Sequence, residues 1–241
     1  MSDAAPDLPA HLRPFVLPHE PAEPERSGDL DLYLPDVTPA PAVLMIHGGP
    51  VPPDRPVGPR QWPAYRAYGS LLATAGLVGA MVEHGFADDE SLPRARDDVQ
   101  SALAALRADP RVDRDRVGLW FFSAGGFLMG SFLEPVADGV VAVAGTYAAV
   151  GDPELPELGL VDGIQAIPNT VVPLLLVRPE HDFDWIVPIT DDVLLRCREA
   201  RRPLTVIDVP GGHHGFETID DTDAVRTAMR DSISWFVAAL R

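Results

Sequence analysis

Cysteine is nearly missing from this chain: Cys197 is the single one among 241 residues. A lone cysteine excludes an internal disulfide and leaves no thiolate cluster for a metal ion. Cys197 follows the apolar residues Val193, Leu194 and Leu195. We therefore predict that it packs within a helix rather than reacting, and we expect no metal site.

Lysine is absent, and all 19 basic residues are arginine. This absence excludes mechanisms in which a lysine acts as the base or forms a Schiff base. The 36 acidic residues outnumber the arginines and give a net charge of −17. Because such a surface repels phosphate groups, we expect neither nucleic acid nor an anionic membrane as a partner.

Long hydrophobic runs are lacking as well. The longest, at 140–150, is interrupted by Gly145 and falls short of the roughly 20 residues that cross a bilayer. The start, Met1-Ser2-Asp3, has neither the basic flank nor the apolar core of a secretion signal. We therefore expect a cytoplasmic protein. The sequence leaves its oligomeric state open between monomer and homodimer.

The domain organisation follows from length and local composition. Residues 1–28 are rich in proline, glutamate and aspartate, which predicts an extended N-terminal arm. The remaining residues, 29–241, have the size of a single α/β domain.

Short apolar runs between polar segments predict the strands of that domain. Residues 30–34 alternate polar and apolar side chains, as an edge strand does, and are a candidate neighbour of the next run. Continuous apolar runs predict buried strands at 42–46, 77–82, 117–122, 140–143, 174–177 and 204–209. Helices are predicted at 65–75, 94–107, 126–133, 189–200 and 223–240. This alternation predicts an α/β fold, with a mostly parallel central sheet of about seven to eight strands and helices on both faces.

A serine follows the strand predicted at 117–122. In Phe122-Ser123-Ala124-Gly125-Gly126 it is flanked by small residues at a strand-to-helix turn, which is how a sheet exposes a reactive hydroxyl. Ser123 is therefore a candidate nucleophile, provided that the chain also supplies a base, an orienting acid and donors for an oxyanion.

The ends of three other predicted strands supply these groups, because ligands of parallel sheets bind beyond the carboxyl ends of the strands. Gly48 or Gly49 is a candidate oxyanion donor together with the N–H of Ala124, although a glycine pair alone also fits a simple tight turn. The acid is Asp182 or, as the alternative, Asp184. The base is His214 or, as the alternative, His213.

These motifs resemble the α/β-hydrolase fold over residues 30–240, and more narrowly the dienelactone-hydrolase-like and prolyl-oligopeptidase-like serine esterases. The resemblance rests on the oxyanion turn His47-Gly48-Gly49-Pro50, the nucleophile elbow 122–126, the acid loop 177–182 and the histidine loop 212–216. Three positions depart from the family pattern. Phe121 replaces the first glycine of G-x-S-x-G, a serine replaces the cysteine of dienelactone hydrolases proper, and Glu180 replaces a glycine of the acid loop.

The resemblance implies a serine hydrolase that cleaves a small carboxylic ester or lactone through an acyl-enzyme, without cofactor or metal. Two other functions remain open. The same residues also suit a non-hydrolytic enzyme that performs an elimination or a cyclisation, and Phe121 is compatible with a non-catalytic protein that binds a small molecule.

Three segments bear on the substrate. Residues 52–68 carry Trp62, Tyr65 and Tyr68 and are predicted either to wall the pocket or to pack a helix onto the sheet. Residues 152–170 are the only room for a lid, which is therefore minimal and favours a compact substrate. Glu83 and His84 end another strand and either reach the pocket or form a structural pair.

Overall fold

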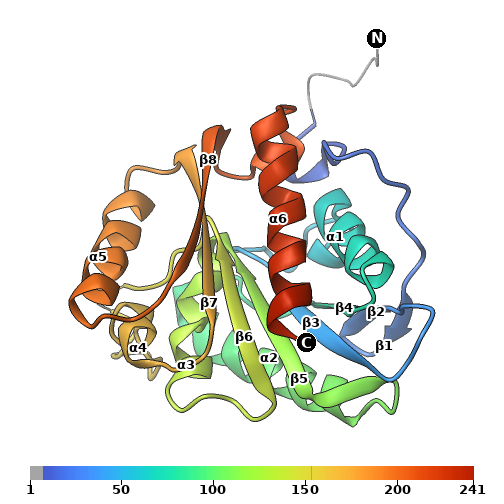
Figure 1. Cartoon of the computed structure of the whole chain (residues 1–241), viewed down its shortest axis with the longest axis horizontal. Helices are drawn as coiled ribbons and strands as arrows, with labels where there is room; N and C mark the ends of the chain where they lie inside the picture. The colour runs from blue at the N-terminus through green and yellow to red at the C-terminus, as the bar shows by residue number, and fades with distance from the viewer. Residues whose placement is uncertain (1–7, 153) are drawn as a thin grey trace.

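The computed structural model describes residues 8–152 and 154–241. In these residues eight strands form one sheet in the order β1-β2-β4-β3-β5-β6-β7-β8 (Figure 1). Strand β1 forms one edge of the sheet and β8 forms the other. The strands are β1 Glu25–Ser27, β2 Leu30–Tyr33, β3 Ala40–Ile46, β4 Val78–Val82, β5 Val112–Phe122, β6 Val140–Thr146, β7 Leu174–His181 and β8 Thr205–His213.

The pairing of the strands is mostly parallel. Antiparallel pairs join β1 to β2 and β2 to β4, whereas the pairs from β4 through β3, β5, β6 and β7 to β8 are parallel. The predicted α/β class with a mostly parallel sheet of seven to eight strands is confirmed. Its parallel part brings the carboxyl ends of six strands to one edge, where the candidate residues lie.

The position expected for the strand at 30–34 is wrong in two respects. Strand β2 pairs with β4 and not with β3, because the chain crosses over through α1 and returns between them. Strand β2 is also not the edge, since β1 covers its outer side. Its one acidic side chain, Asp31, is buried and forms ion pairs with Arg26 and Arg60, which explains how a buried strand tolerates an alternating pattern.

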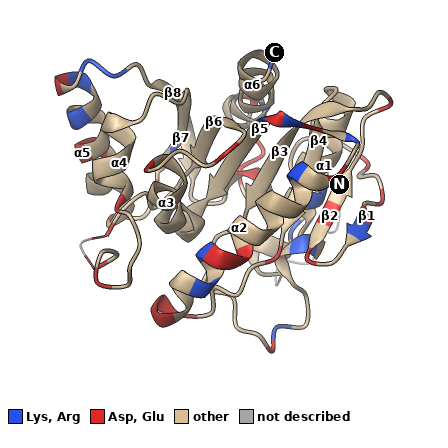
Figure 2. Ribbon diagram, turned by 90° about the horizontal axis from the view of Figure 1, so that it is seen from below, with Lys and Arg blue, Asp and Glu red and all other residues tan. Residues whose placement is uncertain are grey.

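Helices cover both faces of the sheet, as Figure 2 shows. Helices α1 and α6 share one apolar core with the sheet, and α2 to α5 share the other. Four predicted helices are found within a few residues of their expected bounds, and Gly163–Asn169 adds a helix that was not predicted. The helices are α1 Pro63–Thr74, α2 Leu92–Ala108, α3 Gly130–Leu133, α4 Gly163–Asn169, α5 Ile186–Glu199 and α6 Asp223–Ala239.

The helix predicted at 126–133 is divided. A 3₁₀ helix, η4 Ser123–Leu128, comes directly after β5, and α3 follows at Gly130. The start of α3 is tightly packed, because a Cβ on Gly130 would lie 2.1 Å from the carbonyl oxygen of Val161. Helix α3 is therefore pressed against the segment before α4.

The segment 1–28 contains ordered structure within its described part. Residues 8–24 include a short 3₁₀ helix, η1 Ala10–Leu12, and Leu17 is buried against α1 and the sheet. Strand β1 then joins the sheet. Residues 1–7 lie outside the described residues, and the boundary at residue 28 stays a prediction.

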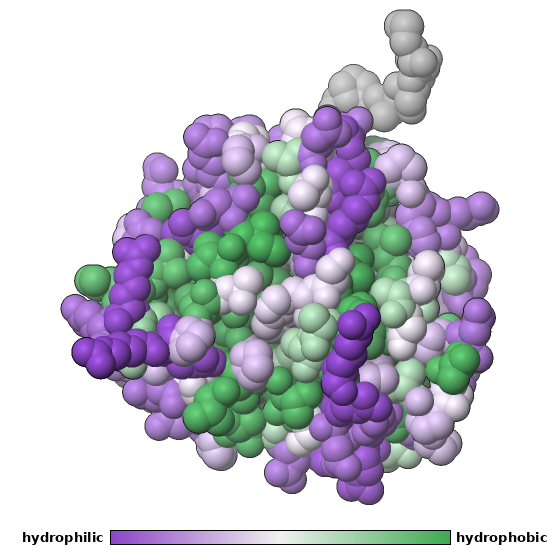
Figure 3. Space-filling model, viewed as in Figure 1, coloured by the Kyte–Doolittle hydropathy of each residue, from purple (hydrophilic) through white to green (hydrophobic). Residues whose placement is uncertain are grey.

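The surface is mixed in character. Charged residues lie on the outer sides of the helices and in the loops, whereas the strands carry few of them (Figure 2). Apolar residues gather between α5 and α6 on the face shown in Figure 3. Among the described helices, none combines the length and the apolar character needed to cross a membrane.

Candidate active site

Ser123 is the first residue of η4, at the sharp turn that follows β5. Its φ of 51° is in the left-handed region, which is costly for a residue with a side chain and is typical of strained functional turns. The turn also depends on Gly125, where a Cβ would lie 2.4 Å from the carbonyl oxygen of His47. The elbow is therefore clamped against the turn that follows β3.

Phe121 occupies the position two residues before the serine without displacing it. Its side chain is fully buried on the face of the sheet that α2 to α5 cover, and its ring centroid lies 6.0 Å from that of Phe132. The residue beside it on β6 is Gly145. The phenylalanine is therefore part of the apolar core on that face of the sheet.

Ser123, His214 and Asp182 form a continuous hydrogen-bonded chain. Ser123 Oγ lies 2.7 Å from His214 Nε2, and His214 Nδ1 lies 2.6 Å from Asp182 Oδ1. The Asp182 and His214 side chains are 7% and 12% exposed. With the Nδ1 proton donated to Asp182, Nε2 is free to accept the proton of the serine hydroxyl.

The two alternative residues lie elsewhere. Asp184 is exposed on the loop between β7 and α5. His213 points to another partner, because its Nδ1 lies 3.0 Å from Asp220 Oδ1 and its backbone N–H donates to the same carboxylate. The structure thus brings together the serine, the first-choice acid and the first-choice histidine.

Gly48 lies directly beside the nucleophile. A Cβ at this position would be 2.7 Å from the Cβ of Ser123 and 3.2 Å from its Oγ, so only glycine fits there. The preceding His47 is buried and its Nδ1 donates to the carbonyl of Gly48 at 2.5 Å. In a trans peptide the C=O and the next N–H point in opposite directions, so the N–H of Gly49 is turned away from His47.

A pair of stacked histidines holds this turn. The ring centroids of His47 and His84 are 3.6 Å apart and the rings are nearly parallel. Two hydrogen bonds also join these residues. The backbone N–H of His84 donates to His47 Nε2 at 3.3 Å, and His84 Nε2 lies 3.1 Å from the carbonyl oxygen of His47. Burial lowers the pKa of His47 to about 4. The neutral ring therefore has one donor and one acceptor, both in use. His84 is thus part of a structural pair with His47, while Glu83 forms an ion pair with Arg60.

A hollow of about 290 Å³ opens above Ser123 and His214. Trp62 and Tyr65 line it, which agrees with the prediction that residues 52–68 wall the pocket. Tyr68 instead is buried against Trp120, which agrees with the alternative that the aromatic residues pack a helix onto the sheet. The lining also includes Ala10, His11, Gly48, Gly49, Pro50, Ala64, Tyr147, Phe183, Gly215, Glu217 and Thr218.

The walls of this hollow differ from the sequence-based expectation. No described residue of 152–170 lines it, because Leu155 and Leu160 of that segment are buried in the core. The N-terminal segment lines it instead, where the ring of His11 lies 4.5 Å from that of Trp62. Nothing in the composition of residues 8–12 signals this role, since it depends on the path of the chain over α1.

Two lining residues, Tyr147 and Glu217, form a buried pair. The Tyr147 hydroxyl donates to Glu217 Oε1, and the Tyr147 ring lies 4.5 Å from that of His214. Burial raises the pKa of Glu217, and its Oε2 has no partner among the described residues. Tyr147 follows the end of β6, so the rule that sites lie beyond strand ends signals it.

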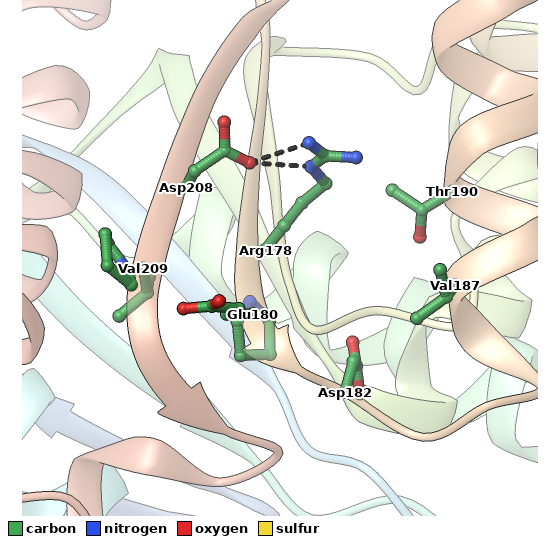
Figure 4. Close-up of a pocket in the computed structure, with 9 residues that line it drawn as sticks. Arg178, Glu180, Asp182, Val187, Thr190, Asp208 and Val209 are labelled. Carbon is green, nitrogen blue, oxygen red and sulfur yellow. Dashed lines mark hydrogen bonds and ion pairs between the residues drawn. The ribbon is translucent and has the colours of Figure 1, made fainter.

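A second hollow, of about 500 Å³, lies behind Asp182, between β7, β8 and α5 (Figure 4). Arg178 crosses it and binds Asp208 at 2.7 Å and Asp191 at 3.1 Å. Neither Ser123 nor His214 lines this hollow. The candidate nucleophile and base therefore face the hollow of about 290 Å³ and not this larger one.

Candidate metal ligands do not cluster in the described part of the chain. Within residues 8–152 and 154–241, no group of three or more histidine, cysteine, aspartate or glutamate side chains is arranged to hold an ion. Cys197 is buried in α5, where burial raises the pKa of its thiol. A buried thiol of raised pKa is a poor nucleophile.

The chain resembles solved structures of esterases. Propionate-bound esterase 2 of Thermogutta terrifontis is 19% identical, with a TM-score of 0.70, over 87% of this chain and 88% of that one. Carboxyl esterase 2 of the fungus Tuber melanosporum is 17% identical, with a TM-score of 0.70, over 88% of this chain and 81% of that one.

A larger protein shares the same architecture. A putative dipeptidyl aminopeptidase IV from Bacteroides ovatus is 17% identical, with a TM-score of 0.68, over 88% of this chain and 33% of that one. No protein-family model and no curated protein matches the chain by sequence. Identities this low report the architecture alone. Eight strands in this order, covered by helices on both faces, give the chain the α/β-hydrolase fold.

Proposed function

We propose that this protein is a serine hydrolase that cleaves a small carboxylic ester or lactone through an acyl-enzyme. The observation that carries the proposal is the hydrogen-bonded chain from Ser123 through His214 to Asp182. A serine hydroxyl is a weak nucleophile, and a histidine base held by a carboxylate is what activates it.

In the first half of the reaction, His214 Nε2 takes the hydroxyl proton while Ser123 Oγ attacks the carbonyl carbon. The carbonyl oxygen becomes an oxyanion, for which the N–H groups of Ala124 and of Gly48 or Gly49 are the donors. Asp182 stabilises the imidazolium through Nδ1. His214 then gives the proton to the departing alcohol oxygen, and the acyl group stays on Ser123.

In the second half, His214 removes a proton from water, whose oxygen attacks the acyl carbon. The bond between that carbon and Ser123 Oγ then breaks, His214 returns the proton to Oγ, and the acid is released. All proton transfers go through His214, so no cofactor or metal takes part. The volume of about 290 Å³ suits a compact substrate. Propionate, which is bound in the Thermogutta esterase, is an acyl group of this compact kind.

A fluorophosphonate probe tests the proposal, because it labels only an activated serine. Intact-mass measurement should show one adduct on the wild type, none on Ser123→Ala, and undiminished labelling of His213→Gln, whose ring is bound to Asp220. A folded wild type that gains no adduct contradicts the hydrolase and favours a non-catalytic binding protein. An adduct without turnover of short esters or lactones favours an elimination or a cyclisation.

A further inference from the structure

A row of aromatic rings leads away from His214 across the surface. The Phe183 ring lies 4.2 Å from that of His214, the Trp185 ring 6.4 Å from that of Phe183, and the Phe127 ring 6.3 Å from that of Trp185. The successive ring planes are inclined by 24°, 14° and 26°. The planes of successive rings are therefore close to parallel. We call Phe183, Trp185 and Phe127 the aromatic row.

Two large apolar side chains of the aromatic row are exposed to solvent. Phe183 and Trp185 are each 50% exposed. Neighbouring exposed rings leave apolar area in water unless a ligand covers it. Phe183 also lines the hollow that contains Ser123, so this area is continuous with the candidate active site.

The loop that carries Phe183 and Trp185 is well anchored. The backbone N–H of Phe183 donates to Asp182 Oδ1 at 2.8 Å, and the N–H of Ile186 donates to the carbonyl of Phe183 at 2.9 Å. Trp185 immediately precedes α5. The rings are thus held in a fixed relation to the acid that orients His214, as a preorganised binding surface requires.

The chemistry of ester cleavage places the alcohol part of the substrate, and not its acyl part, next to the aromatic row. His214 must donate its proton to the leaving oxygen, so the alcohol group begins next to the His214 ring. The aromatic row begins at the same ring. We propose that the substrate is an ester of an alcohol with a planar aromatic group, which stacks on Phe183 and Trp185 while the acyl group occupies the hollow at Ser123. This inference rests on the proposed function.

Pairs of esters that differ only in planarity test it. The 2-naphthylmethyl and decahydro-2-naphthylmethyl esters of propionate have similar size and leaving alcohols of similar acidity, so a difference in kcat/KM reports binding of the ring. The wild type should prefer the planar ester by roughly two- to tenfold, the size of one aromatic contact. Trp185→Leu should bring the ratio close to one.

A matched control is Leu195→Ala, which removes an exposed apolar side chain from α5. It should leave the ratio unchanged. An undiminished preference in Trp185→Leu, or a wild-type ratio of one, overturns the proposal while the hydrolase stands.

Binding separates this proposal from the hydrolase itself. In Ser123→Ala, calorimetry should show that 2-naphthalenemethanol binds more tightly than its decahydro analogue, and that Trp185→Leu abolishes the difference. This result is expected even if no ester is hydrolysed. Equal binding of the two alcohols overturns the inference.

Discussion

The hydroxyl of Tyr147 donates a hydrogen bond to the buried carboxylate of Glu217, and the same tyrosine packs its ring against His214. Tyr147 follows β6 and Glu217 belongs to the 3₁₀ helix η5, Phe216–Thr218, just after the histidine. The pair therefore ties the end of the central sheet to the loop that carries the candidate base. Through the contact between the Tyr147 and His214 rings, the pair also packs against the candidate base.

Tyr147→Phe should destabilise the fold by roughly 1–3 kcal/mol, because it leaves a buried carboxylate without its partner. Burial raises the pKa of Glu217 above 4.5, so the folded protein favours the protonated carboxyl group. The stabilisation from this protonated form is complete below pH 4.5 and is lost as the pH rises through the folded-state pKa. The loss in Tyr147→Phe should therefore be larger at pH 8 than at pH 5 in urea unfolding. The double variant Tyr147→Phe/Glu217→Leu should recover stability at pH 8. A cost that does not change with pH would contradict a role for the Glu217 charge.

The acid of the candidate triad can be tested with a neighbouring control. Asp182→Asn should lower kcat for a short ester by about 10⁴-fold, as loss of the orienting carboxylate does in other serine hydrolases with a histidine base. Asp184→Asn changes an exposed side chain and should stay within about twofold of the wild type. Equal effects of the two substitutions would show that Asp182 does not orient His214.

Phe121 is expected to matter for stability and not for catalysis. Phe121→Ala removes a fully buried ring that packs on Phe132, which should cost about 3–5 kcal/mol in unfolding free energy. Because its side chain is on the face away from α1 and α6, labelling of Ser123 by the fluorophosphonate should proceed at nearly the wild-type rate in the folded fraction. A large rise in labelling rate would mean that Phe121 restrains the elbow.

The sheet and the candidate triad were largely predictable because each depends on short, local patterns. Continuous apolar runs mark strands that are covered on both faces, and the ends of parallel strands meet at one edge. Thus Ser123, Asp182 and His214 were drawn together by topology without knowledge of any distance. The sequence alone does not distinguish Asp182 from Asp184, since both residues belong to one loop and only the folded loop brings one carboxylate to the His214 ring.

Long-range placement accounts for what the sequence did not predict. Strand β2 was expected beside β3, and local alternation carries no information about the crossover that inserts β4. His11 lines the hollow because the N-terminal segment crosses α1, where the N–H of Ala22 bonds Ser70 Oγ and Phe15 packs on Tyr68. These contacts join residues about 50 positions apart, which periodicity cannot reveal.

Gly48 should be indispensable for activity although it lies outside the triad. A Cβ in Gly48→Ala would overlap Ser123 Cβ at 2.7 Å, so the turn or the elbow must move and the oxyanion donors move with it. Loss of one such donor costs about 10²–10³-fold in kcat. The control is Gly85→Ala, where a Cβ would meet only the flexible side chains of Arg94 and Asp98 at 3.2 Å. Wild-type kcat in Gly48→Ala would exclude this turn from the oxyanion site.

The stacked histidines should make the oxyanion turn sensitive to acid. In the neutral ring, His47 Nδ1 donates to the carbonyl of Gly48, and Nε2 accepts from the N–H of His84. Protonation puts a hydrogen on Nε2, which then faces another donor. Burial lowers the pKa of His47 from 6.5 to about 4, so the protein binds this proton less readily when folded than when unfolded. The stabilisation is therefore complete above pH 6.5 and is lost as the pH falls through about 4.

Urea unfolding of the wild type and of His47→Asn between pH 7.5 and pH 4 isolates this contribution, because the carboxylates paired with arginine are the same in both chains. Asparagine still offers a donor to the Gly48 carbonyl but does not titrate. The wild type should lose up to about 3 kcal/mol more than the variant over this range, which corresponds to the shift of the His47 pKa. If the unfolding free energies of the two proteins change with pH in parallel, the His47–His84 stack accepts a proton without cost. In that case His47 is not held as a neutral ring with one donor and one acceptor at the oxyanion turn.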